Sequence, residues 1–126
     1  MTKILVVEDD IFLANAYRIK LQKVGFEVII VTDGVEALEK IKSEKIDLII
    51  LDLIIPKIDG FGVLAEIRSK EEYKNIPILV ASNLGQSEDL NRAMKLGAND
   101  FVVKSDTPLD MLIEKIKKLI SQNDSQ

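Results

Sequence analysis

Short apolar runs alternate along the chain with longer segments in which apolar residues recur every three or four positions. The short runs predict strands and the longer segments predict amphipathic helices. The predicted strands are KILVV (3–7), EVIIV (27–31), IDLIIL (46–51), IPILVA (76–81) and DFVVK (100–104). The run 46–51 shows no polar alternation, which indicates burial on both faces. Strands that alternate with helices predict an α/β fold with a parallel sheet covered on both sides.

The predicted helices cover about residues 10–24, 32–44, 60–70, 87–97 and 107–120. We expect Asp10 to cap the first of these helices, and Ser87 and Thr107 to cap the last two. Asp110 completes a capping-box pattern with Thr107. The inward face expected for the first helix is Leu13, Ala16, Tyr17, Leu21 and Val24, and that of the fourth is Leu90, Ala93 and Met94.

We adopt the strand order 2-1-3-4-5, which is known from doubly wound sheets with this succession of strands and helices. The order is taken by analogy, because the pattern of apolar runs does not determine it. In that order the first and third strands are neighbours. The acidic run Glu8-Asp9-Asp10 and the carboxylate of Asp52 then meet at one end of the sheet. Binding residues of such sheets lie at the carboxyl ends of the strands.

Length, composition and charge narrow the classes of function that the chain can have. A chain of 126 residues with 47% hydrophobic residues fits one domain, expected over residues 1–121, with a polar tail at 122–126. A net charge of −4 without a basic stripe argues against direct nucleic-acid binding. The chain has no cysteine and no histidine, so its chemistry rests on carboxylates, hydroxyls and lysines. No signal peptide or membrane span is recognisable, so a cytoplasmic location is expected.

Asp52 directly follows four apolar residues, Leu48 to Leu51. An unpaired charge in a buried strand costs several kcal/mol, so this carboxylate is expected at the strand end with partners. Ser82 and Lys104 close the fourth and fifth strands at the same edge. Clustered carboxylates need a cation, and a divalent cation such as Mg²⁺ together with the lysine satisfies that need.

Four pieces of the sequence, ILVVEDD, LIILDLIIPKIDG, ILVASN and GANDFVVK, occur in order at strand ends. With these pieces the chain resembles the CheY-like receiver domains of two-component response regulators, over residues 3 to about 120. The resemblance implies a flavodoxin-like fold and a phosphoacceptor. The roles that it implies are Asp52 as phosphoacceptor, Glu8, Asp9, Asp52 and the Ile54 carbonyl as Mg²⁺ ligands, Ser82 and Lys104 as partners of the phosphoryl group, and Ser82 and Phe101 as switch residues.

By this resemblance the chain is a signalling switch that catalyses only its own phosphorylation and dephosphorylation. A histidine kinase or a histidine phosphotransfer protein supplies the phosphoryl group, because the chain itself has no histidine. Phosphorylation then changes the binding of a downstream protein, and a phosphorylation-linked dimer is compatible with this role.

Two positions depart from the family pattern. The family usually follows its lysine with a proline in a cis peptide, and this chain has Ser105 there. A cis bond costs about 2.5–4 kcal/mol without proline, so the loop is either trans and shaped differently or strained. Asn83 follows Ser82 where the family usually has a small apolar residue.

Ile54 and Leu84 stand two residues beyond Asp52 and Ser82, at positions that flank the path of the hydrolytic water in receivers. Two apolar side chains would neither orient nor admit water well, so slow self-dephosphorylation is expected.

Three alternatives are weighed against this hypothesis. A phosphatase of the haloacid dehalogenase type needs a second aspartate two residues after its nucleophile, where this chain has Ile54. A pseudo-receiver, which binds proteins but is never phosphorylated, is kept open by Ser105. A flavin-binding flavodoxin is disfavoured because no phosphate-binding loop rich in Ser, Thr and Gly follows the first strand.

Overall fold

The computed structural model describes residues 1–124. The strands are β1 (Lys3–Val7), β2 (Glu27–Val31), β3 (Leu48–Leu51), β4 (Ile78–Ser82) and β5 (Asp100–Val103). The helices are α1 (Ile11–Val24), α2 (Gly34–Ser43), α3 (Gly60–Arg68), α4 (Ser87–Lys95) and α5 (Leu109–Asp124), with two short 3-10 turns at Glu71–Tyr73 and Lys104–Asp106.

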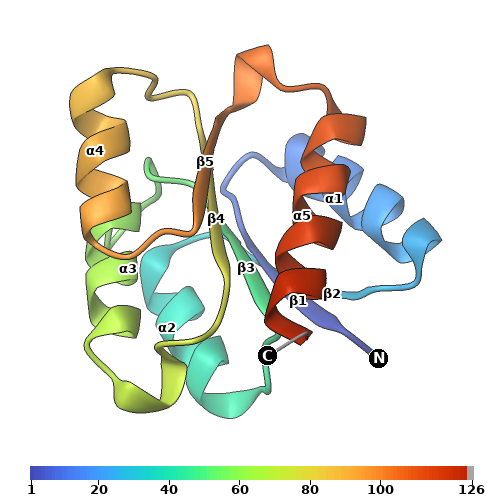
Figure 1. The fold of residues 1–126 in the computed structure, drawn as a ribbon, viewed down its shortest axis with the longest axis horizontal. Helices are drawn as coiled ribbons and strands as arrows, with labels where there is room; N and C mark the ends of the chain where they lie inside the picture. The colour runs from blue at the N-terminus through green and yellow to red at the C-terminus, as the bar shows by residue number, and fades with distance from the viewer. Residues whose placement is uncertain (125–126) are drawn as a thin grey trace.

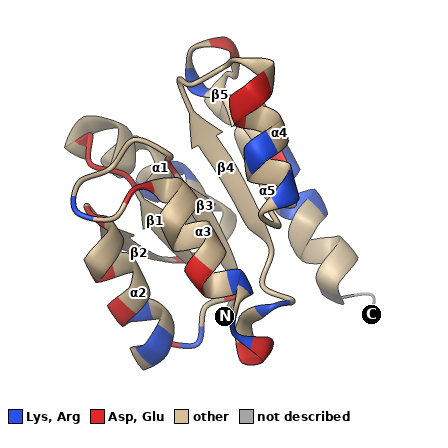
Figure 2. Ribbon diagram, turned by 90° about the vertical axis from the view of Figure 1, so that its left-hand side faces the viewer, with Lys and Arg blue, Asp and Glu red and all other residues tan. Residues whose placement is uncertain are grey.

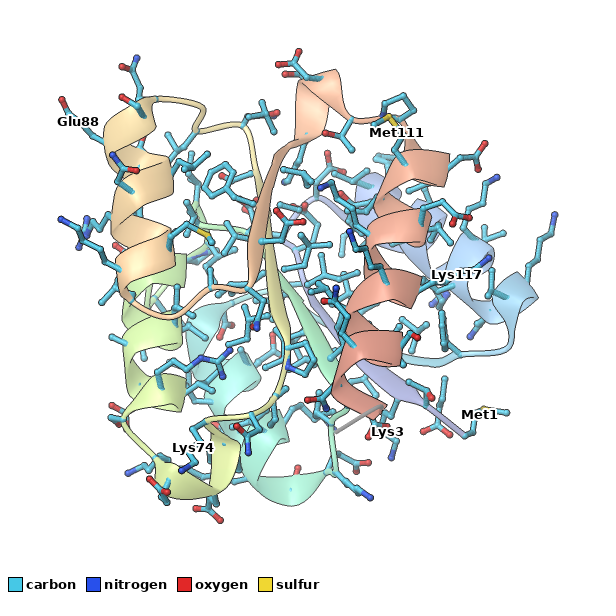
Figure 3. All side chains as sticks on the ribbon, viewed as in Figure 1. Met1, Lys3, Lys74, Glu88, Met111 and Lys117 are labelled. Atoms are coloured by element: carbon cyan, nitrogen blue, oxygen red, sulfur yellow. The ribbon has the colours of Figure 1, made fainter. Side chains whose placement is uncertain are left out.

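All neighbouring strands are parallel and follow the order β2-β1-β3-β4-β5, which confirms the predicted fold class. Helices α1 and α5 cover one face of the sheet, and α2, α3 and α4 cover the other (Figure 1). Each face has its own core cluster, because side chains that alternate along a strand point to opposite faces. One cluster includes Val7, Leu51 and Leu64, and the other includes Val6, Ile50 and Ile113. Side chains fill both layers between sheet and helices (Figure 3).

Two strands begin two residues later than the apolar runs predict, at Leu48 and Ile78. Ile46 and Ile76 are apolar but lie in the connections, where Ile46 is buried and Ile76 packs against the core. Burial of an apolar residue does not require strand geometry, so the apolar run overestimates the length of the strand.

The N-cap predicted for α1 is confirmed, since an Asp10 carboxylate oxygen accepts a hydrogen bond from the Leu13 amide at 3.2 Å. The predicted inner face of this helix is partly wrong. Ala14, Tyr17 and Leu21 are its buried residues, whereas Val24 is 42% exposed at the last turn. Gly25 ends the helix in the left-handed conformation (φ 103°).

The predicted caps of α4 and α5 are wrong. Gln86 stands at the N-cap of α4, so Ser87 is its first helical residue. The Thr107 hydroxyl donates to the Val103 carbonyl at 2.9 Å rather than accepting from the helix. The Asp110 carboxylate pairs with Lys20 on α1, 2.8 Å away. The capping-box pattern is therefore present in the sequence, but its side chains have other partners.

The outer helices α4 and α5 also differ from expectation in packing and length. Ala93 is buried on α4, but Leu90 and Met94 are 39% and 41% exposed. Helix α5 continues to Asp124, three residues past the predicted end of the domain at residue 121. The rest of the predicted tail, residues 125–126, lies outside the described range.

Both basic and acidic residues occur on α2 and on α4 (Figure 2). Within residues 1–124 no helix has both the length and the apolar character needed to cross a bilayer.

Candidate functional site

The register of the sheet brings the two central acids together. Val7 of β1 lies opposite Leu51 of β3, so Glu8 and Asp52 are the first residues beyond the paired ends of neighbouring strands. Their backbones are held by the sheet, because the Asp52 amide donates to the Val7 carbonyl at 3.1 Å. Both side chains are buried, with 2% of Glu8 and 5% of Asp52 exposed.

Lys104 reaches both acids from the end of β5. Its ammonium lies 2.7 Å from Asp52 Oδ2 and also forms an ion pair with the Glu8 carboxylate. Only 12% of the lysine side chain is exposed. The Lys104–Ser105 peptide bond is trans, so the first of the two loop shapes left open by the sequence is the one observed.

Burial and ion pairing shift the pKa values of Glu8 and Lys104 in opposite directions. Burial raises the pKa of Glu8, and the contact with Lys104 lowers it by less than burial raises it. Burial also disfavours the charged form of Lys104, but hydrogen bonds with Asp52 and Glu8 outweigh it and raise the lysine pKa. The ammonium is therefore firmly charged, and burial makes the anionic form of Glu8 less favourable, so that this carboxylate gains from a nearby cation.

The acidic cluster fits a hard divalent cation. Carboxylate oxygens of Glu8, Asp9 and Asp52 all lie within 4.8 Å of one another, and Asp9 is exposed to solvent. Carboxylate oxygens are the ligands that Mg²⁺ prefers, together with water and phosphate oxygens. Ile54, the predicted carbonyl ligand, follows closely, and its amide donates to Asp52 Oδ1 at 3.2 Å.

The two predicted switch residues occupy different depths. Ser82 ends β4 opposite Val103, is fully buried, and its hydroxyl oxygen accepts from the Leu84 amide at 3.4 Å. Phe101 lies on β5, half-buried, and packs against the core cluster that α2, α3 and α4 share. The structure thus brings Ser82 to the edge next to Lys104, and it places Phe101 three residues before the lysine on β5.

Three residues that surround the site were not assigned to it from the sequence. Tyr17 of α1, read there as core, lines a pocket of about 270 Å³ beside Lys104, and burial raises its pKa to about 12. Asn83 accepts a hydrogen bond from the Ser105 amide at 3.0 Å. Gly60, the first residue of α3, lies against the Asp52 carbonyl. The only signal in the sequence was that Asn83 and Ser105 both depart from the family pattern.

A protein-family model described as "response regulator receiver domain" matches residues 4–117 of the chain. A probable transcriptional regulator, ycf27, from Cyanophora paradoxa is 37% identical over 98% of this chain and 50% of its own length. The chain spans about half the length of such curated relatives.

Solved structures give the same result. The Francisella response regulator 1452 receiver domain superposes with a TM-score of 0.89 at 29% identity, over 97% of this chain and 98% of that one. The receiver domain of the sensor histidine kinase PA1611 from Pseudomonas aeruginosa gives a TM-score of 0.86 at 26% identity, over 95% and 98% of the two chains. That structure is described as having a magnesium ion coordinated in the active-site cleft.

Proposed function

Because the chain belongs to the response regulator receiver family, we propose that Asp52 is its phosphoacceptor and that Glu8, Asp9, Asp52 and the Ile54 carbonyl hold Mg²⁺. The observation that carries the proposal is the pairing of a buried Asp52 carboxylate with the Lys104 ammonium, 2.7 Å away, at the ends of β3 and β5. Phosphorylation of an aspartate is the general function of this family.

The proposed reaction is a phosphoryl transfer. A carboxylate oxygen of Asp52 attacks phosphorus, the bond from phosphorus to the leaving group breaks, and the donor departs with the bonding electrons. Bound Mg²⁺ would neutralise charge on the phosphoryl oxygens. Lys104 is already at Asp52 and can move its ammonium onto a new oxyanion over a short path. The buried Ser82 hydroxyl supplies a donor at the next strand end.

The donor histidine must come from another molecule, since the chain contains none. We infer a histidine kinase or a histidine phosphotransfer protein in this role. The phosphoryl group would then shift the face formed by α4, β5 and α5 between two packings, with Ser82 and Phe101 as the moving parts. The target is a downstream protein, and regulation of transcription, which the matched relatives' names state for them, is one output that a longer chain could add.

The pseudo-receiver alternative is not supported. In the sequence it was kept open by Ser105, and a Lys104 side chain turned into solvent would have supported it. Lys104 instead points into the acidic cluster with 12% of its side chain exposed. The haloacid dehalogenase alternative lacks its second aspartate, since Ile54 occupies that position.

The proposal is tested by intact mass spectrometry after incubation with acetyl phosphate, with Mg²⁺ or with EDTA. We expect a gain of one phosphoryl group in Mg²⁺ and at least a roughly hundred-fold slower gain in EDTA, because the anionic donor would meet uncompensated carboxylates. Absence of any gain in Mg²⁺ would remove the proposed function.

We also expect the phosphoryl group to persist for longer than seconds once the donor is removed. Ile54 is 56% exposed and Leu84 packs on the core, so neither position offers a polar group to orient water. Replacing Leu84 with glutamate should shorten the lifetime roughly ten-fold, a modest effect beside that of a fully positioned general base. The matched control is Leu90→Glu on α4. A lifetime of seconds that Leu84→Glu leaves unchanged would contradict the expectation.

A further inference from the structure

Asn83 and Ser105 connect two loops at the carboxyl edge of the sheet. The connection from β4 to α4 and the turn after β5 emerge at the same end of the molecule (Figure 1). Backbone pairing of the two strands ends at Ser82 and Val103. One residue past the end of β4, the side-chain oxygen of Asn83 accepts a hydrogen bond from the Ser105 amide at 3.0 Å. The asparagine side chain thus adds one hydrogen bond beyond the end of the ladder.

With this hydrogen bond, the residues on both sides of Lys104 are held in place. On one side of the lysine, Val103 is fixed by the sheet, and on the other side Ser105 is fixed by Asn83. The turn is closed further on by Thr107, whose amide donates to the Lys104 carbonyl at 3.3 Å and whose hydroxyl donates to the Val103 carbonyl at 2.9 Å. The backbone from which the lysine side chain extends is therefore held at both ends.

A lysine needs such support more than most residues. Its ammonium lies at the end of a flexible four-carbon stem with many rotamers, so a fixed backbone narrows the range of positions that the charged group can reach. Here the ammonium must meet both Asp52 and Glu8. A proline at position 105 would stiffen the turn and would have no amide to satisfy. Ser105 does have an amide, and Asn83 satisfies it. The two departures from the family pattern are in direct contact.

We propose that Asn83 is a positioning residue for the phosphoryl transfer, and that it acts by holding the Ser105 amide so that Lys104 stays aligned with Asp52. This inference rests on the proposed function of Asp52. In this view the hydrogen bond between Asn83 and Ser105 takes the place of the proline that stiffens the turn after the lysine in the family pattern.

The test compares phosphorylation rates with acetyl phosphate and Mg²⁺ in four chains: wild type, Asn83→Ala, Lys104→Met and the double variant. Asn83→Ala should lower the rate about five-fold in the wild-type background, as the loss of one neutral hydrogen bond implies. In the Lys104→Met background the same change should have no effect, because Asn83 acts through the lysine. A loss of equal size in both backgrounds would overturn the proposal. A faster Asn83→Ala would also overturn it, since it would mean that the side chain only narrows entry to the site.

Amide hydrogen exchange of the unphosphorylated chain provides a second measurement that needs no turnover. Exchange at Ser105 should become about five-fold faster in Asn83→Ala and stay unchanged in Asn91→Ala, an exposed asparagine on α4. Unchanged exchange at Ser105 would overturn the proposal even if Lys104→Met reacts too slowly to follow. Failure of the wild type to be phosphorylated would instead remove the proposed function and leave the hydrogen bond itself measurable.

Discussion

Replacing Asp52 with asparagine should abolish the Mg²⁺-dependent gain of a phosphoryl group, lowering the rate by at least about 10³-fold. The amide of asparagine has nearly the same shape as the carboxylate but lacks the anionic oxygen that, in the proposed reaction, attacks phosphorus. Lys104 keeps its partner Glu8 in the variant, so its ammonium does not lose all of its counter-charge. The loss should therefore be one of chemistry rather than of folding. Intact mass spectrometry with acetyl phosphate measures it directly.

The matched control is Asp106→Asn, which removes an exposed carboxylate from the same edge of the sheet. We expect this variant to react within about two-fold of wild type, because surface charges contribute little through solvent. A phosphoryl gain that survives in Asp52→Asn would mean that another group is the acceptor, with Glu8 and Asp9 of the same carboxylate cluster as candidates. Thermal unfolding of both variants shows whether each is folded during the assay.

Strand positions and strand-end residues were predictable because the register of a parallel sheet leaves little freedom. Once β1 and β3 are neighbours with Val7 opposite Leu51, Glu8 and Asp52 must lie side by side. The order that makes those strands neighbours came from analogy, since apolar runs alone do not distinguish one arrangement of parallel strands from another.

Helix ends and helix faces were less predictable, because a polar side chain has several partners within reach. Thr107 and Asp110 match a capping box, but Thr107 bonds back to Val103 and Asp110 pairs with Lys20 on α1. A capping pattern indicates which hydrogen bonds a side chain can form with the backbone of its own helix. It contains no information about a partner such as Lys20, 90 residues away in sequence.

The supporting contacts of the site were also out of reach of the sequence. The bond from the Ser105 amide to Asn83 joins residues 22 apart and depends on how two loops approach each other. The same holds for Arg68, which donates to the carbonyls of Gly97, Tyr73 and Ile76 and so ties the end of α3 to two connections. Such contacts follow from tertiary geometry, and no periodicity predicts them.

Replacing Gly60 with alanine should lower the free energy of unfolding by at least about 3 kcal/mol, the upper end of the usual cost of overpacking. A Cβ at this position would lie 2.3 Å from the Asp52 carbonyl oxygen and 2.5 Å from the Leu53 Cα. Both are backbone atoms, so rotation of a side chain cannot relieve the clash. The Gly60 amide also donates to the Leu53 carbonyl at 2.9 Å, which fixes the start of α3 against the end of β3. Urea unfolding measures the loss as a shift of the transition midpoint.

The control, Gly85→Ala, places a Cβ 3.4 Å from a Val103 methyl group, an ordinary van der Waals contact, and should change the stability by less than about 1 kcal/mol. Since the clash in Gly60→Ala falls on the backbone of Asp52, the proposed nucleophile, any chain that does fold must move α3 or the Asp52 backbone. Such a movement also changes the distance from Asp52 to Lys104. Phosphorylation of the folded fraction should therefore be slower in Gly60→Ala than in Gly85→Ala. Equal stability of the two variants would contradict the close approach of α3 to the strand end, and equal rates in the folded fractions would show that Asp52 tolerates displacement of its backbone.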